Sequence, residues 1–166
     1  MNNQHLNEKK TRLSVDYFEK MHIIKNRKED EVAIMLIQFN FKNFRSFREE
    51  VTLDLSATKM TEFSERVVTI GSEKILPIAA IYGANASGKS NIYSAFEYMA
   101  EYVVDSFKYG DEEEKFEEYR PTPFLFDSTS ADAESSFEVY FTIPGDKNEK
   151  TYNYGFCVDQ EGVTEE

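Results

Sequence analysis

Apolar and polar residues alternate along two pairs of segments, which is the pattern of half-buried β-strands. In the first pair, MLIQFNF (35–41) and VTLDL (51–55) are joined by KNFRSFREE, and we expect a hairpin or a bent antiparallel pair. In the second pair, SFEVYFTI (136–143) and TYNYGFCV (151–158) flank PGDKNEK, which has favourable turn residues. This hairpin would place one set of apolar side chains on the same face of a sheet: Phe137, Val139, Phe141, Ile143, Tyr152, Tyr154, Phe156 and Val158.

A nearly continuous apolar run, ILPIAAIY (Ile75–Tyr82), has the character of a strand that is buried on both faces. Pro77 would lie near its start, because proline cannot donate a ladder hydrogen bond. Val67–Ile70 is a further short strand candidate. Asn91–Lys108 is predicted to be a helix, because its apolar residues recur every three or four positions and form one face: Ile92, Ala95, Phe96, Met99, Val103 and Phe107.

The same pattern divides the chain into two parts. Residues 1–34 are polar except for Leu13, Tyr17, Met21 and Ile24, whose spacing fits one stripe of an amphipathic helix, so we expect a partly helical arm or extension. Residues 35–166 would form the main domain. Within it, DEEEKFEE (111–118) is predicted to be a solvated loop because six of its eight residues are acidic.

One segment carries recognisable chemistry. Gly83–Ser90 reads GANASGKS and fits the phosphate-binding P-loop (Walker A) pattern G-x-x-x-x-G-K-[ST], between a predicted strand and a predicted helix. Small residues let the backbone curl so that several amide N–H groups converge on a phosphate. Lys89 is the candidate catalytic residue, because its ammonium can contact the β- and γ-phosphates, and Ser90 is the candidate Mg²⁺ ligand. The predicted nucleotide-binding residues of this segment are Gly83, Ala84, Asn85, Ala86, Ser87, Gly88, Lys89, Ser90 and Asn91.

Composition narrows the choice of partners. The chain is 40% apolar and 30% charged, as in a globular protein, and its 31 acidic residues against 19 Lys and Arg give a net charge of −12. Broad binding of nucleic-acid phosphates by this segment is therefore not favoured. A single cysteine, Cys157, excludes an intrachain disulfide, and the longest aliphatic run, Val32–Ile37, is far too short for a membrane span. We expect a cytoplasmic protein without a membrane partner.

Two segments together resemble a known group of ATPases. MLIQFNFKNFRSF, which contains Asn43-Phe44-Arg45-Ser46-Phe47, and IYGANASGKSN resemble the RecF/SMC-like branch of ABC-type ATPases, and most of all the prokaryotic AAA-family ATP-binding proteins related to the OLD and abortive-infection ATPases. Ala86 stands where RecF and SMC proteins usually have a further glycine. The resemblance spans residues 35–166 and includes the hairpin near the end of the sequence. It implies an α/β P-loop NTPase fold, the N-terminal lobe of an ABC-type ATPase, with a mixed β-sheet around the P-loop helix and an antiparallel β layer.

The resemblance also implies ligands and partners. ATP and Mg²⁺ would bind. Four residues just after the first strand would lie near the nucleotide, namely Lys42, Asn43, Arg45 and Ser46, with Arg45 as a phosphate-facing cation. A signature segment, a switch histidine and a Walker B strand with its catalytic glutamate are expected from a C-terminal lobe and a homodimer partner. Phe124-Leu125-Phe126-Asp127 mimics a Walker B strand, but the proline before it and the lack of a second acid favour an ordinary strand end. We therefore expect ATPase activity in a longer protein, and weak nucleotide binding with negligible hydrolysis for this chain alone.

Phage defence or DNA maintenance is the setting that the family likeness suggests. Two other classes of function stay open. A P-loop kinase or GTPase would use the same phosphate loop, although the sequence lacks the guanine-specific N-K-x-D motif. A protein-interaction module that is independent of nucleotide would instead use the acidic surface and the N-terminal arm.

Overall fold

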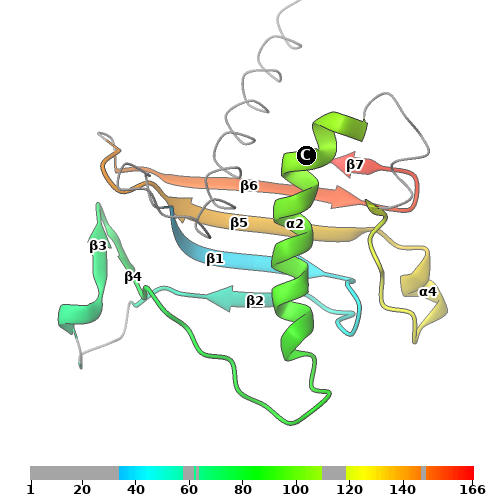
Figure 1. Ribbon diagram of the computed structural model, residues 1–166, viewed down its shortest axis with the longest axis horizontal. Coiled ribbons are helices and arrows are strands. Elements are labelled where there is room, and N and C mark those ends of the chain that lie inside the picture. The colour runs from blue at the N-terminus through cyan, green and yellow to red at the C-terminus, as the bar shows by residue number, and fades with distance from the viewer. Residues whose placement is uncertain (1–33, 58–61, 63, 110–118, 147–148) are drawn as a thin grey trace, which may run out of the picture.

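The centre of the molecule is a five-stranded sheet in the order β2-β1-β5-β6-β7, with one long helix, α2, lying across one face (Figure 1). This computed structural model describes residues 34–57, 62, 64–109, 119–146 and 149–166, with the backbone alone for 105–109. The sheet strands are β1 (Met35–Lys42), β2 (Val51–Asp54), β5 (Ser135–Thr142), β6 (Thr151–Val158) and β7 (Val163–Glu165). The remaining elements are α2 (Lys89–Tyr109), the 3₁₀ turn η2 (Ser64–Arg66), the ribbon strands β3 (Val68–Ile70) and β4 (Glu73–Ile75), and the short helix α4 (Ser128–Ala131).

Both predicted strand pairs are confirmed. β1 and β2 pair antiparallel, and β5 and β6 place Phe137 opposite Phe156 and Val139 opposite Tyr154, so these side chains share one face. The strand pair that joins the two hairpins is β1 with β5, which sets Phe41 opposite Phe137 across almost a hundred residues of sequence. Sequence periodicity alone gives no signal for this long-range pairing.

The inner face of the sheet and α2 enclose an aromatic core. Phe39, Ala95 and Met99 are fully buried, and the rings of Phe39 and Phe96 meet edge to face with centroids 5.2 Å apart. Such a pair adds about 1 kcal/mol to the burial of the rings themselves. Every described member of the two predicted apolar faces is buried or packed against this core, and only the side chain of Phe107 lies outside the described residues.

The predicted buried strand at Ile75–Tyr82 is wrong. Only Ile75 belongs to a strand, and beyond it residues 76–84 run as irregular chain. Ile78 and Tyr82 are 81% and 89% exposed, although Ile75 is fully buried. An apolar strand of this kind needs a neighbour on each side to accept its backbone hydrogen bonds and cover its side chains. None of the described strands lies beside residues 77–82, so the described sheets pair antiparallel throughout instead of forming the mixed sheet that was expected.

Two other expectations for the loops have different outcomes. The expected strand end at Phe124–Asp127 is wrong, because Leu125 and Phe126 form a turn and Asp127 is the N-cap of α4, accepting a hydrogen bond from the Thr129 N–H. The helical stripe within residues 1–33 and the acidic loop 111–118 lie outside the described residues. Among the helices that the structure describes, none is long and apolar enough to cross a membrane.

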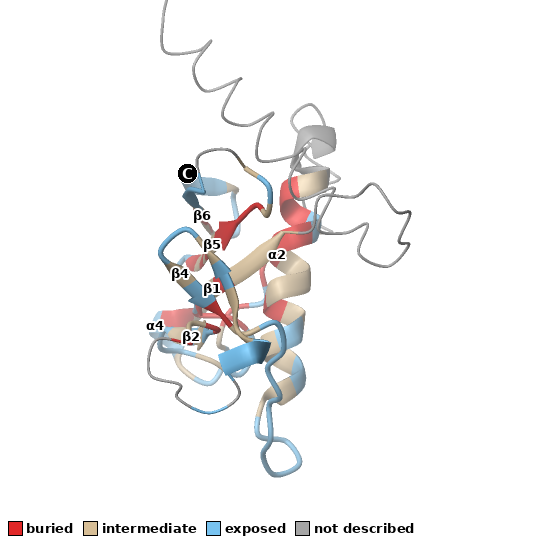
Figure 2. Ribbon diagram, turned by 90° about the vertical axis from the view of Figure 1, so that its left-hand side faces the viewer, coloured by how far each residue is buried: buried red, intermediate tan, exposed pale blue. Residues whose placement is uncertain are grey.

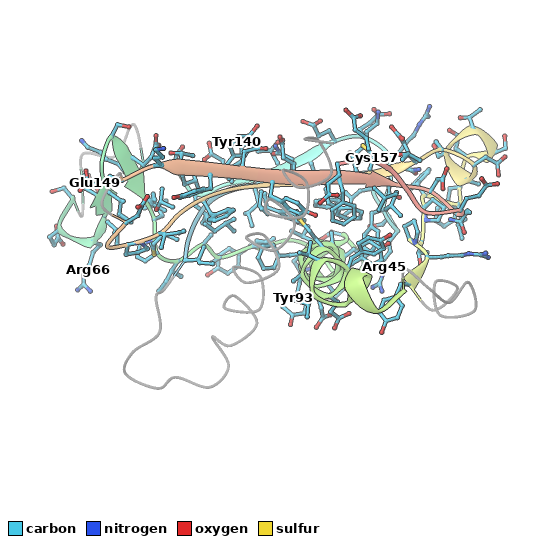
Figure 3. The ribbon with its side chains drawn as sticks, turned by 90° about the horizontal axis from the view of Figure 1, so that it is seen from above. Arg45, Arg66, Tyr93, Tyr140, Glu149 and Cys157 are labelled. Carbon is cyan, nitrogen blue, oxygen red and sulfur yellow. The ribbon has the colours of Figure 1, made fainter. Side chains whose placement is uncertain are left out.

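The outer face of the sheet is polar and is organised by Glu138. Its carboxylate accepts hydrogen bonds from Asn153 Nδ2 at 2.8 Å, Asn40 Nδ2 at 2.9 Å and the Tyr140 hydroxyl at 2.9 Å. Figure 3 shows Tyr140 on the side of the sheet away from α2. Burial by itself would raise the pKa of Glu138, but the three hydrogen bonds together lower it below the ordinary glutamate value.

This network predicts a pH-dependent contribution to stability. Glu138→Gln should lower the free energy of unfolding by about 1 kcal/mol at pH 7, because an amide cannot accept from all three donors. Since the folded pKa is depressed, the difference between the two proteins should be complete above about pH 4.3, the pKa of an unfolded glutamate, and should shrink as the pH falls through the folded value. Urea denaturation at pH 7 and at pH 3.5 measures both numbers. A difference that stays constant with pH would contradict this assignment.

Candidate nucleotide-binding site

Residues 83–88 form a surface loop that leads directly into α2 (Figure 2, bottom). Ala86 and Gly88 both have left-handed backbone conformations, with φ of 63° and 87°. Left-handed residues between ordinary ones are the backbone conformations that an anion nest uses to turn successive N–H groups toward one point. Ala86 thus occupies a conformation that glycine adopts more easily.

Lys89 folds back into this loop. Its Nζ donates to the carbonyl oxygens of Gly83 at 2.9 Å and Ala84 at 2.5 Å, and lies 3.4 Å from Ser87 Oγ. The Ser87 N–H in turn bonds to the Ala84 carbonyl at 3.3 Å, which closes the loop on itself. The ammonium is therefore enclosed by the curl of residues 83–87.

Helix α2 begins at the end of the loop. The N–H groups of Asn91 and Ile92 both donate to the Gly88 carbonyl, while the first N–H groups of a helix have no acceptor within it. The N–H groups of the first helical turn that have no acceptor within the helix, together with the helix dipole, attract an anion at this end. The Ser90 side chain is exposed beside them. Among the described residues no cluster of three or more His, Cys, Asp or Glu could hold a metal ion. The hydroxyl of Ser90 as a ligand of Mg²⁺ stays a prediction from the motif.

The turn between β1 and β2 lies directly on the P-loop. A Cβ atom placed on Gly88 would stand only 2.9 Å from both Phe47 Cζ and Ser46 Oγ, closer than real Cβ contacts. The turn is itself tight, because the Phe44 and Phe47 backbones exchange hydrogen bonds of 2.8 and 3.0 Å. The two motifs that carry the family resemblance, about forty residues apart in sequence, are thus in van der Waals contact.

Polar contacts connect the same turn to the first turns of α2. Asn91 Nδ2 donates to Ser46 Oγ at 2.8 Å, and Arg45 Nη1 donates to Ser94 Oγ at 2.9 Å. Arg45 has a left-handed backbone, with φ of 51°, and Figure 3 shows it beside α2 on the inner side of the sheet. No carboxylate among the described residues pairs with Arg45 or Lys89. In a chain with a net charge of −12, two cations near one helix terminus that no described carboxylate neutralises favour an anionic ligand.

Asn43 differs from the other predicted site residues because it is buried. Its side chain is 3% exposed, and all its hydrogen-bonding groups contact the backbone of the segment around α4. The structure therefore brings the P-loop residues, Asn91 and Arg45 together at the surface and places Asn43 beneath them. Contact of Asn43 or Arg45 with a nucleotide stays a prediction.

The family resemblance placed Ser46 near the nucleotide, and the structure brings its hydroxyl to Asn91 and Gly88. Sequence reasoning did not select Phe47 or Ser94. Phe47 lies within the N-F-R-S-F motif, so the motif itself was a usable signal for it. Ser94 had only its place on the helix, one turn after Ser90, and nothing in the sequence connects it to Arg45. A contact between distant segments has to be seen in the fold.

A separate hollow of about 350 Å³ lies on the opposite face of the sheet. Its walls include Asn40, Glu50, Glu138, Asn153 and Cys157. Desolvation, followed by nearby glutamates, raises the pKa of the Cys157 thiol, so the thiol is not activated as a nucleophile. The acidic lining repels phosphate, so the exposed P-loop is the better candidate for a nucleotide.

The P-loop arrangement is a strand, a glycine-rich loop with a lysine, and a helix. The structure has the loop, Lys89 and the helix, whereas residues 76–84 before the loop form no strand. Residues 78–166, just over half of the chain, match the family model described as "AAA domain, putative AbiEii toxin, Type IV TA system". The chain belongs to this AAA-domain family, a group of nucleotide-binding ATPases that generally take ATP with Mg²⁺. Neither a curated protein nor a solved structure gave a match.

The contact at Gly88 predicts a large effect of a single methyl group. Gly88→Ala should lower the free energy of unfolding by about 2–4 kcal/mol, because it adds backbone strain to a clash with Phe47 and Ser46. The matched control is Gly145→Ala, where φ is 83° but no atom lies within 4 Å of the new Cβ. The control carries the strain alone and should cost about 1–2 kcal/mol. Urea denaturation of the three proteins measures the difference, and equal losses would show that the turn does not lie on Gly88.

Proposed function

We propose that this chain binds MgATP through the loop at residues 83–90, as the nucleotide-binding lobe of an ATPase. The observation that carries the proposal is the convergence of the anion nest, the free N-terminal end of α2, Lys89 and Arg45 at one exposed place. Each of these groups attracts phosphate for a different physical reason, and a surface loop with no binding role would not need all four.

The residues present fit a triphosphate and its metal ion. Lys89 Nζ now donates to two carbonyl oxygens, and an incoming phosphate oxygen would compete for these donors with a full negative charge. Arg45 would supply a second cation with several N–H donors, held at Ser94. Ser90 would hold Mg²⁺, which when bound neutralises phosphate charge and orients the chain of phosphates.

The finer assignment rests on the N-F-R-S-F turn. We propose that the protein is an ABC-type ATPase of the RecF/SMC/OLD-like kind, because the contact between this turn and Gly88 gives a structural reason for the two motifs to occur together. A C-terminal lobe and a second copy of the protein would supply the signature, the Walker B strand and the groups that position the attacking water. The exposed apolar run at residues 78–82 supports this, since none of the strands that the structure describes lies beside it to cover such a segment.

The biological setting is part of the proposal. Phage defence or DNA maintenance was suggested by likeness, and the family description, which names a toxin of a type IV TA system, supports the first. ATP binding would then act as the control on an effector outside these residues, and hydrolysis would depend on the complete assembly.

Loss of the lysine charge gives the direct test. Lys89→Ala should weaken binding of a slowly hydrolysed ATP analogue with Mg²⁺ by roughly tenfold or more, because charge-assisted hydrogen bonds to phosphate are removed. Calorimetric titration measures the affinity, and urea denaturation checks that the variant is folded. Lys74→Ala, which removes an exposed lysine from β4, is the matched control and should bind as the unaltered chain does. Equal affinity of the Lys89 variant, or no binding by any of the three, would overturn the proposal.

A further inference from the structure

Asn43 is the most fully engaged polar side chain near the site. Its Nδ2 donates to the carbonyl oxygens of Ser130 at 2.8 Å, Ala133 at 2.9 Å and Glu134 at 3.2 Å, and its Oδ1 accepts from the Phe124 N–H at 3.1 Å. An asparagine amide has two hydrogens and one oxygen to offer, so these four contacts use its capacity. A nucleotide could reach this side chain only by displacing buried hydrogen bonds.

The backbone of Asn43 is equally constrained. Its φ of 52° is left-handed, a conformation that asparagine tolerates better than most residues. Its carbonyl oxygen accepts a hydrogen bond of 2.6 Å from Ser135 Oγ, and its N–H donates to the Arg48 carbonyl at 3.2 Å. The residue therefore fixes the point where β1 reverses direction.

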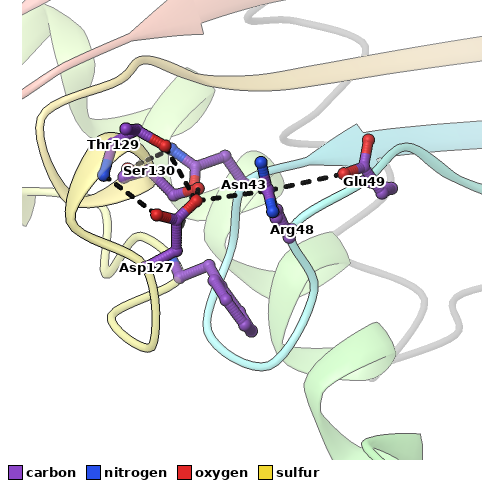
Figure 4. A network of polar contacts seen from close by, with 7 residues as sticks. Asn43, Arg48, Glu49, Asp127, Thr129 and Ser130 are labelled. Atoms are coloured by element: carbon purple, nitrogen blue, oxygen red, sulfur yellow. Dashed lines mark hydrogen bonds and ion pairs between the residues drawn. The ribbon is translucent and has the colours of Figure 1, made fainter.

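The segment that Asn43 holds also touches the turn from the other side. The Arg45 N–H donates to the Thr122 carbonyl at 2.7 Å, and Arg48 forms an ion pair of 3.3 Å with Asp127. Figure 4 shows Asn43, Arg48 and Asp127 in one network between the β1–β2 turn and α4. Residues 43–48 and the segment 122–134, which includes α4, are thus joined by the buried amide of Asn43 and by these two further contacts.

This arrangement determines where Arg45 points. Arg45 follows Asn43 by two residues, in a turn whose ends are pinned by Asn43 and by the backbone bonds between Phe44 and Phe47. Only with this turn in place does the guanidinium reach Ser94 on α2. We infer that Asn43 is a positioning residue of the nucleotide site, which holds Arg45 in place to receive phosphate and does not itself touch the ligand. The inference rests on the proposed function of the P-loop.

A double-mutant cycle on nucleotide affinity separates this role from direct contact. Asn43→Gly removes the amide while keeping a residue that is comfortable at positive φ, so backbone strain is not added. Arg45→Ala should weaken binding of the MgATP analogue roughly tenfold, the loss expected for a charged hydrogen bond to phosphate. Asn43→Gly should weaken it several-fold, and the double variant should bind no worse than Arg45→Ala to within about twofold, because the amide then has no arginine left to position.

Two further variants serve as controls for the double-mutant cycle. Asn40→Ala removes an asparagine side chain from the outer face of β1, where it contacts Glu138, and should leave the affinity unchanged. Ser135→Ala removes only the 2.6 Å bond to the Asn43 carbonyl and replaces Asn43→Gly if that variant does not fold. Ser135→Ala should then weaken binding of the MgATP analogue when Arg45 is present, and should not change it in the Arg45→Ala background.

The outcomes are distinct. If the fold losses of affinity caused by Asn43→Gly and Arg45→Ala multiply in the double variant, the positioning role is overturned. An unchanged affinity of Asn43→Gly overturns it as well. Both results leave the P-loop proposal intact. If the unaltered chain does not bind the analogue, or Lys89→Ala binds equally well, the proposed function fails and the inference fails with it. A non-additive double-mutant cycle, together with an unchanged affinity of Asn40→Ala, establishes the positioning role of Asn43.

Discussion

The aromatic layer between the sheet and α2 is the interaction on which the rest of the structure depends. Phe39, Phe41, Phe137 and Phe156 come from three strands and pack against one face of the helix, so the helix axis is fixed relative to the end of β1. Because α2 begins at Lys89, fixing the helix also fixes the P-loop against the β1–β2 turn. The loop proposed to bind phosphate is exposed, but the aromatic layer that holds it in place through α2 is the most deeply buried part of the described structure.

The site therefore consists of two short segments with little secondary structure, each held by different means. Hydrogen bonds within residues 83–89 and the absence of a side chain on Gly88 shape the P-loop. The turn at residues 43–48 is held by the buried amide of Asn43 and by the segment before α4. Burying that amide is tolerable only because every polar atom is paired. This gives the turn the rigidity that a cation needs if it is to meet phosphate without a large ordering cost.

Much of this could be predicted from the sequence, and the failures share a cause. Local periodicity gave both hairpins and α2, and the G-x-x-x-x-G-K-[ST] pattern marked the loop that the structure places at the start of α2. Phosphate binding by that loop stays a prediction. Pairing of β1 with β5 and the contact of Ser46 with Asn91 join distant segments, for which periodicity carries no information. Residues Ile78–Tyr82 are apolar, as the residues of a buried strand are. A strand also requires neighbouring strands, and the described sheets provide none there. Asp127 was seen as a strand end because a helix of four residues is too short to show a period.

The central claim is that the N-F-R-S-F turn and the P-loop form one ligand site. Hydrogen–deuterium exchange of the chain with and without the MgATP analogue tests it most directly, because exchange reports on each segment separately. The account predicts slower amide exchange on ligand addition in residues 43–48 as well as in residues 84–91, with the edge strand β7 unchanged. Slowing confined to residues 84–91, with the turn at 43–48 unaffected, would contradict the account.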